Sequence, residues 1–263
     1  MAPLFTLAPG LPSPNPGGIM RILLFLLLIC LFPAAVAQAD VCVKRHTHTE
    51  GYYNGGVDYP PEDRDDEIWI SGDKIAVIGP NRSVIVSSAD SLMFFVNHTD
   101  SSYVEIALPM DWTAAAGEQL AARVMSFQRH GEVEETGESK KIGEWNCKGY
   151  RTTSWNVYEG KRYYETESTV WVATDLPIDL DAYTAMMNHL GVLRSYHVDY
   201  IKELGKMHGV PVSSEAVNYR KGFSFNSNEE LLDAFEGDPP AGVYAVPEGY
   251  TKKEQITMQD LRG

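Results

Sequence analysis

Residues 145–173 of this chain read WNCKGYRTTSWNVYEGKRYYETESTVWVA. Aromatic residues, threonine and valine dominate this stretch, and these residue types favour extended strands. Glu159-Gly160 divides it into two runs, at the point where a tight hairpin turn needs a residue that tolerates positive φ. The stretch therefore predicts a hairpin of two long antiparallel strands, 145–158 and 161–173.

The chain before this hairpin also predicts strands. Short alternating or β-branched runs are separated by turn residues such as Gly79-Pro80-Asn81, a spacing typical of an antiparallel meander in one sheet. Residues 51–66 contain Pro60-Pro61 and four acids in the five positions 62–66, so we expect a long exposed loop there. The predicted strands are 41–49, 67–71, 74–78, 83–87, 92–97, 103–108 and 132–135.

Two segments have apolar residues at helical spacing. In 113–129 they are Leu120, Val124 and Phe127, which predicts an amphipathic helix lying on the sheet. Asp179 is a residue type that caps helix N-termini, and it precedes a predicted helical segment that runs to Leu204, with Gly191 and Gly205 as candidate breaks. The apolar face of that segment comprises Tyr183, Met186, Met187, Leu190, Leu193, Ile201 and Leu204.

The C-terminal part predicts a strand at 219–225, a short helix at 228–235 and a last strand at 242–246. Neither an internal repeat nor a low-complexity linker interrupts the chain. We therefore expect a single α+β domain over 40–263, built mainly of antiparallel strands.

The N-terminal residues predict export. Arg21 precedes the apolar run 22–32, and Pro33 and small residues up to Ala39 follow it, which is the anatomy of a cleavable signal peptide. We assign 1–39 to this leader, with Met20 as the expected start of translation. The apolar run is shorter than the about 20 residues that span a bilayer, so we expect no transmembrane segment after cleavage.

The charge of the chain excludes some binding partners, and its cysteines suggest a disulfide. The chain has 22 Lys and Arg against 36 Asp and Glu, and such an acidic surface is a poor partner for nucleic acid or anionic lipid head groups. Removal of the leader takes Cys30 with it and leaves Cys42 and Cys147, which in an exported chain suggest one disulfide. The alternative is a pair of buried free thiols on neighbouring strands.

The sequence contains no motif of a common catalytic centre or phosphate loop, so we expect a protein that is not an enzyme and needs no cofactor. His46 and His48 are two apart on the first predicted strand, and residues two apart share one face. They are weak candidates for a metal site, because no third ligand can be assigned. The alternative is a solvated strand face.

Aromatic residues lie on or beside the strands, and methionines lie on or beside the helices. Such side chains either fill the space between a sheet and its helices or line an apolar cavity there. The candidate ligand-binding residues are Trp69, Phe95, Tyr103, Trp112, Val124, Phe127, Trp171, Met186, Met187 and Leu190.

Four patches occur in the order WNCKGY (145–150), VWVATDLPI (170–178), GVPV (209–212) and VPEGY (246–250). Together they resemble a bacterial exported family known as a domain of unknown function, which looks like a relative of the LolA/LolB lipoprotein-carrier fold. The resemblance implies a strongly curved, unclosed barrel with helices plugging its concave side, and an apolar pocket for acyl chains. It also implies a periplasmic location.

Three functional hypotheses follow from this sequence. The first is a monomeric carrier or envelope sensor that binds a lipid or a lipidated protein between the sheet and the helices. The second is a structural or protein-interaction domain with a filled core. The third is a metal-binding envelope protein that uses His46 and His48.

Overall fold

The structure is a computed structural model that describes residues 39–262, so the predicted signal peptide lies outside the described residues except for Ala39. Twelve strands form one sheet in the order β14-β8-β7-β6-β5-β4-β1-β13-β12-β11-β10-β9, and β2 and β3 form a separate pair. The sheet is not closed, and every neighbouring pair in it is antiparallel except β14 with β8. The α+β class with a mainly antiparallel sheet is thus confirmed.

The strands are β1 (Asp40–Thr49), β2 (Tyr52–Asn54), β3 (Val57–Tyr59), β4 (Glu62–Ile70), β5 (Lys74–Ile78), β6 (Arg82–Ser87), β7 (Leu92–Asn97), β8 (Ser102–Ala107), β9 (Arg129–Ile142), β10 (Trp145–Tyr158), β11 (Lys161–Ala173), β12 (Val210–Arg220), β13 (Phe223–Gly237) and β14 (Thr251–Lys253). The helices are α2 (Trp112–Met125), α3 (Leu180–Leu193), α4 (Val198–Leu204) and the short 3-10 helix η1 (Asp260–Arg262). None of the helices between residues 39 and 262 is long and apolar enough to cross a membrane.

The aromatic hairpin forms as predicted. Its strands β10 and β11 pair from Tyr158 and Lys161 at the turn to Cys147 and Ala173 at the far end. The two turn residues have φ of 48° and 72°, and positive φ at both central positions is what a two-residue hairpin turn with the strand twist requires.

The acidic stretch after Gly51 corrects the sequence prediction. It is not a loop, because 52–59 form the β2–β3 hairpin and β4 begins at Glu62. The Tyr52 ring stacks on Tyr59 at 4.7 Å between centroids and on Phe225 at 4.3 Å. Four of the five acids of β4 face basic or histidine side chains across the β1–β4 pairing, so opposite charges stabilise this acidic strand.

The C-terminal part differs most from the prediction. Residues 228–235 are not a helix but the middle of β13, which lies between β1 and β12 and is paired with both. The predicted strand 219–225 contains the turn between β12 and β13. Residues 242–246 are turns rather than a strand.

The helices lie close to their predicted positions. α2 is interrupted at Gly117, where φ is 74°. The long segment after Asp179 divides into α3 and α4, and the break comes after Arg194 rather than at Gly191. Gly205 caps the end of α4, as one of the two candidate breaks predicted.

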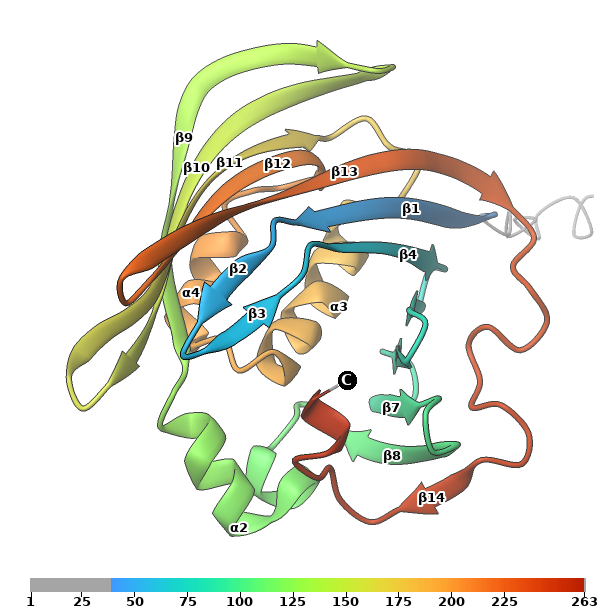
Figure 1. Cartoon of the computed structure of the whole chain (residues 1–263). Coiled ribbons are helices and arrows are strands. Elements are labelled where there is room, and N and C mark those ends of the chain that lie inside the picture. Colours follow the sequence, from blue (N-terminus) through green and yellow to red (C-terminus); the bar gives the residue numbers. More distant parts are fainter. Residues whose placement is uncertain (1–38, 263) are drawn as a thin grey trace, which may run out of the picture. The chain divides into compact units, whose positions relative to one another are not determined.

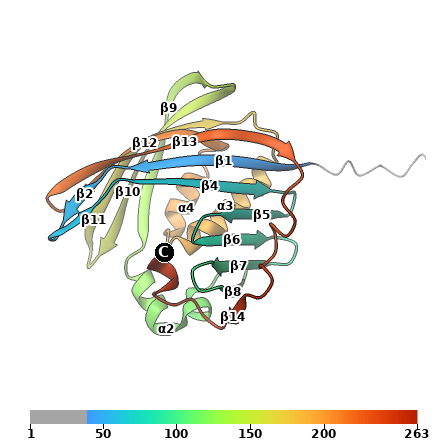
Figure 2. The ribbon, with the colours of Figure 1, turned by 45° about the vertical axis from the view of Figure 1, so that its right-hand side comes forward.

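Hydrophobic side chains are buried on both faces of the β4–β8 half of the sheet. The main core contains Val41, Val43 and Ile68 with residues of α2 and α3, whereas Cys42 and Trp69 belong to a second cluster under Val243 and its neighbours. In Figure 1, α3 and α4 lie on one side of the sheet, and the segment between β13 and β14 lies on the other. Figure 2 shows that segment running beside the ends of β5 to β7.

The two cysteines correct the disulfide prediction. Cys42 and Cys147 are free thiols on β1 and β10, which are four steps apart in the strand order. At about 4.8 Å a step this exceeds the about 7 Å between Cα atoms that a disulfide can bridge. The alternative of buried thiols holds, although their strands are not neighbours.

Alkylation with iodoacetamide in the absence of reductant checks this assignment. Cys42 is 0% and Cys147 is 2% exposed, and burial raises the pKa of Cys42 to about 11 and also raises that of Cys147. Because the thiolate is the reactive form, we expect neither to react in the native protein and both to react in guanidinium chloride. A pair of peptides joined by a disulfide in the denatured digest would contradict the structure.

Candidate functional site

A cavity of about 290 Å³ lies between α3, α4 and the sheet. Met187 of α3, Ile201 and Leu204 of α4, and Met207 after α4 supply apolar walls, and Val170 of β11 supplies part of the floor. The volume is close to the lower end, about 300 Å³, of the range for ligand pockets. The site is therefore suited to a small ligand with an apolar part.

The two helices create this cavity because the sequence positions them locally. Asp179 accepts hydrogen bonds from the backbone N–H groups of Asp181 and Ala182, each at 3.0 Å, and so starts α3. Met186 and Leu190 then enter the main core, while Met187 lines the cavity.

α4 is held against α3 and β9 by close contacts at glycines. A Cβ atom at Gly191 would lie 3.2 Å from Ile201, and one at Gly131 would lie 2.4 Å from the Tyr200 ring. These glycines allow α4 to approach closely. Glu203 also accepts a hydrogen bond from the backbone N–H of Val133 at 3.0 Å.

One buried cation lines the same cavity. Arg45 of β1 is only 8% exposed and donates from Nη1 to Oε1 of Glu229 on β13 at 3.0 Å. Burial opposes the charge, yet the Glu229 carboxylate holds the pKa of Arg45 above its ordinary value. The buried Nε–H of Arg45 has no hydrogen-bond partner within the part of the chain that the structure describes.

The predicted ligand-binding residues divide into three groups. Seven belong to the main core or pack against it, and of these only Met187 lines the cavity. Trp69 and Tyr103 lie in the second cluster, on the opposite face of the sheet. Phe127 contacts Tyr158 and Tyr164 instead, with ring centroids 6.2 and 5.5 Å apart. The seven are Phe95, Trp112, Val124, Trp171, Met186, Met187 and Leu190.

The sequence reading missed Arg45 and Glu229. A usable indication was present, because Arg45 continues the alternation of Val41 and Val43 and so falls on their inward face. A charged residue at such a position requires a partner or a function. Glu229 gives no corresponding indication, because its sequence predicts a helix over 228–235.

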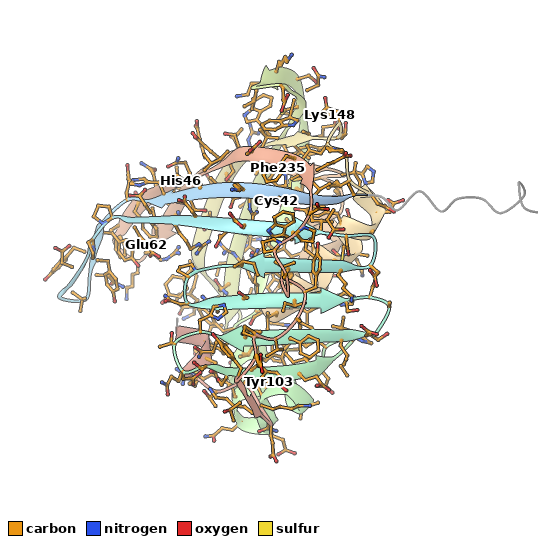
Figure 3. The ribbon with its side chains drawn as sticks, turned by 90° about the vertical axis from the view of Figure 1, so that its right-hand side faces the viewer. Cys42, His46, Glu62, Tyr103, Lys148 and Phe235 are labelled. Carbon is orange, nitrogen blue, oxygen red and sulfur yellow. The ribbon has the colours of Figure 1, made fainter. Side chains whose placement is uncertain are left out.

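His46 and His48 are bound by carboxylates across the β1–β4 pairing. Nδ1 of His46 donates to Asp65 and Nδ1 of His48 donates to Asp63, each at 2.7 Å, and Nε2 of His46 lies 3.3 Å from Asp63. Figure 3 shows His46 on β1 beside the strand that begins at Glu62. Within residues 39–262 no group of three or more His, Cys, Asp or Glu side chains is placed to hold a metal ion.

This histidine–aspartate cluster predicts a pH-dependent contribution to stability. The Asp65 hydrogen bond raises the pKa of His46, and the His48 hydrogen bond lowers the pKa of Asp63. The His46 contribution is present below the ordinary imidazole value of 6.5 and is lost as pH rises through the raised value; the Asp63 contribution is present above 3.8 and is lost as pH falls through the lowered value.

We therefore expect His46→Gln to lower the urea midpoint most between pH 3.8 and 6.5 and to have little effect at about pH 8. His189→Gln is the control, because that imidazole has a pKa lowered by burial and takes no part in the cluster. An equal effect of His46→Gln between pH 3.8 and 6.5 and at about pH 8 would show that the ring acts only by packing.

A second depression, of about 660 Å³, is lined mostly by polar side chains, including Glu50, Arg151, Glu167 and Glu215. An apolar ligand would gain little there, because its binding requires burial against apolar surface. We therefore take the smaller cavity beside α3 and α4 as the candidate site.

No protein-family model matches this chain, and no curated protein matches it.

Proposed function

We propose that this protein is an exported, non-enzymatic carrier or envelope sensor that binds a hydrophobic ligand in the cavity between α3, α4 and the sheet. The ligand class is a lipid or the acyl chain of a lipidated protein. The observation that carries the proposal is the cavity of about 290 Å³, whose walls include Met187, Ile201, Leu204 and Met207. Methionine and leucine side chains adapt to flexible apolar chains.

The proposal includes the architecture that the LolA/LolB resemblance implies, a strongly curved, unclosed barrel with helices plugging its concave side. The order of the strands supports it, because β14 and β9 are free edges of one sheet. The position of α3 and α4 on one side of the sheet in Figure 1 also supports it. The predicted signal peptide and the same resemblance support a periplasmic location.

A filled-core interaction domain is the second candidate. It is favoured by the packing of Phe95, Trp112, Met186 and Leu190, which are at most 5% exposed and leave no room for a ligand among them. On this view the cavity beside α4 is a packing imperfection, and the protein acts through its surface.

Ligand binding separates the two candidates. The protein, purified after export from its native host, should carry a lipid or acyl chain that native mass spectrometry and organic extraction detect. The neutral probe N-phenyl-1-naphthylamine should become fluorescent in the delipidated protein, and dodecan-1-ol should displace it.

A cavity-filling variant and a matched surface variant complete the test. Leu204→Trp places a bulky ring in the cavity wall and should abolish probe binding. Leu232→Trp makes the same change at a side chain that is 56% exposed and should leave binding intact. A chain without extractable lipid, and without probe fluorescence in the wild type, would support the interaction domain instead.

A further inference from the structure

The charge of the candidate cavity is opposite to that of the protein. The whole chain has a formal net charge of −14, whereas the charged side chains that line this cavity are Arg45, Arg194 and Glu229, two cations and one anion. Inside a site of low dielectric constant, an excess positive charge attracts an anion more strongly than it would in water.

The buried guanidinium of Arg45 is only partly used. Its Nη1 donates to Glu229, and its buried Nε–H has no acceptor among residues 39–262. A guanidinium presents its donors as a rigid fork that matches the two oxygens of an oxyanion. The guanidinium of a cavity-lining arginine thus keeps donor capacity beyond its one bond to Glu229, and burying a donor without a partner costs free energy.

We infer that the ligand of this cavity is a single-chain amphiphile with an oxyanionic head group, and that Arg45 binds the head group. This inference rests on the proposed function and names its ligand class. A single chain is indicated because the cavity is small, about 290 Å³. The acidic outer surface does not prevent binding of an anionic ligand, because the head group would lie inside the cavity.

The lining contains both polar and apolar side chains. Arg45 interacts electrostatically with Tyr183, and Tyr183 interacts electrostatically with Arg194. We assign these three lining side chains to the head-group region. Leu204 and Met207 pack against a separate apolar cluster that contains Val170, and they form the tail region.

Glu229 makes the inference testable in two directions. Its carboxylate competes with a ligand oxyanion for the same guanidinium, so Glu229→Gln should strengthen the binding of an anionic ligand. Loss of the guanidinium should weaken it. General damage to the fold would weaken binding in both cases, and an increase in affinity cannot arise from damage.

The experiment is displacement of N-phenyl-1-naphthylamine from the full chain by dodecanoate and by dodecan-1-ol, which differ only in the head group. Wild-type protein should bind dodecanoate about tenfold more tightly than the alcohol. Acetate should not displace the probe, because it has the head group without the chain; displacement by acetate at equal concentration would overturn the amphiphile assignment.

Four proteins decide the role of Arg45. Glu229→Gln should increase the preference for dodecanoate, and the double variant Arg45→Met/Glu229→Met, which leaves neither charge unpaired, should abolish it while still binding the alcohol. Arg151→Met, which removes an exposed arginine of β10 outside this cavity, should behave as wild type. The inference would be overturned, but not the proposed function, if wild type bound dodecanoate and dodecan-1-ol equally or if the double variant kept the preference for dodecanoate. If none of the four proteins bound either competitor, both the inference and the proposed function would be overturned.

Discussion

Replacing Gly209 with alanine should destabilise the protein by about 3 kcal/mol, a value in the tail of the distribution for single substitutions. Gly209 precedes β12 and has φ of 151°, in a region that side chains other than glycine rarely adopt. An added Cβ would lie 2.3 Å from the carbonyl oxygen of Ala173 and 2.7 Å from the Val172 side chain. The oxygen belongs to the backbone of β11, so it cannot move aside cheaply. Urea unfolding followed by tryptophan fluorescence measures the loss.

Gly72→Ala is the control for this substitution. Gly72 lies in the turn before β5 and does not require positive φ, and a Cβ added there would have no atom within 4 Å. Its stability change should therefore stay within about 0.5 kcal/mol. Gly209 also lines the candidate cavity. Its alanine variant should therefore lose ligand binding over the same urea concentrations at which it unfolds. Equal urea midpoints for Gly209→Ala and wild type would show that the β11–β12 approach is looser than the structure has it.

Local patterns predicted the elements whose partners lie nearby in the sequence. The β10–β11 hairpin follows from one turn and two β-rich runs, and α3 follows from the Asp179 cap and its apolar spacing. The helix prediction for residues 228–235 was wrong because their sequence, NEELLDAF, contains good helix formers. Their strand state depends on β1, a segment about 180 residues earlier, for example through the pairing of His48 with Asn228. Such long-range strand pairing overrides local propensity, and a short stretch of sequence considered alone does not reveal it.

The candidate site was only partly predictable for a related reason. An aromatic residue on a strand indicates burial, but in this sheet both faces are buried between β1 and β8. Trp69 and Phe95 therefore looked alike in the sequence although they lie on opposite faces. The side chains that cover the second face, around Val243 and Tyr244, come from residues 242–246, for which the sequence predicts a strand.

Removing one partner of the Arg45–Glu229 pair should be costly, whereas removing both should not. Glu229→Met leaves a guanidinium whose side chain is 9% exposed without its carboxylate partner, and breaking a buried pair in this way costs about 3 kcal/mol. Arg45→Met leaves Glu229, whose side chain is 30% exposed and can still reach water, so its cost should be smaller, about 2 kcal/mol. The double variant Arg45→Met/Glu229→Met should lie within about 1 kcal/mol of wild type, because apolar side chains replace both charges.

Urea unfolding of the three variants and wild type gives the coupling free energy of the pair as a double-mutant cycle. Lys44→Met and Glu67→Met provide the exposed control pair, with side chains 41% and 45% exposed, and neither should change the urea midpoint noticeably. If the Arg45 and Glu229 losses simply add in the double variant, the two side chains act independently, and Glu229 is not the group that neutralises the buried guanidinium. If they cancel as expected, the pair holds a cation at the cavity wall at little net cost in stability. That is the condition under which a fold can retain a buried arginine for binding a ligand.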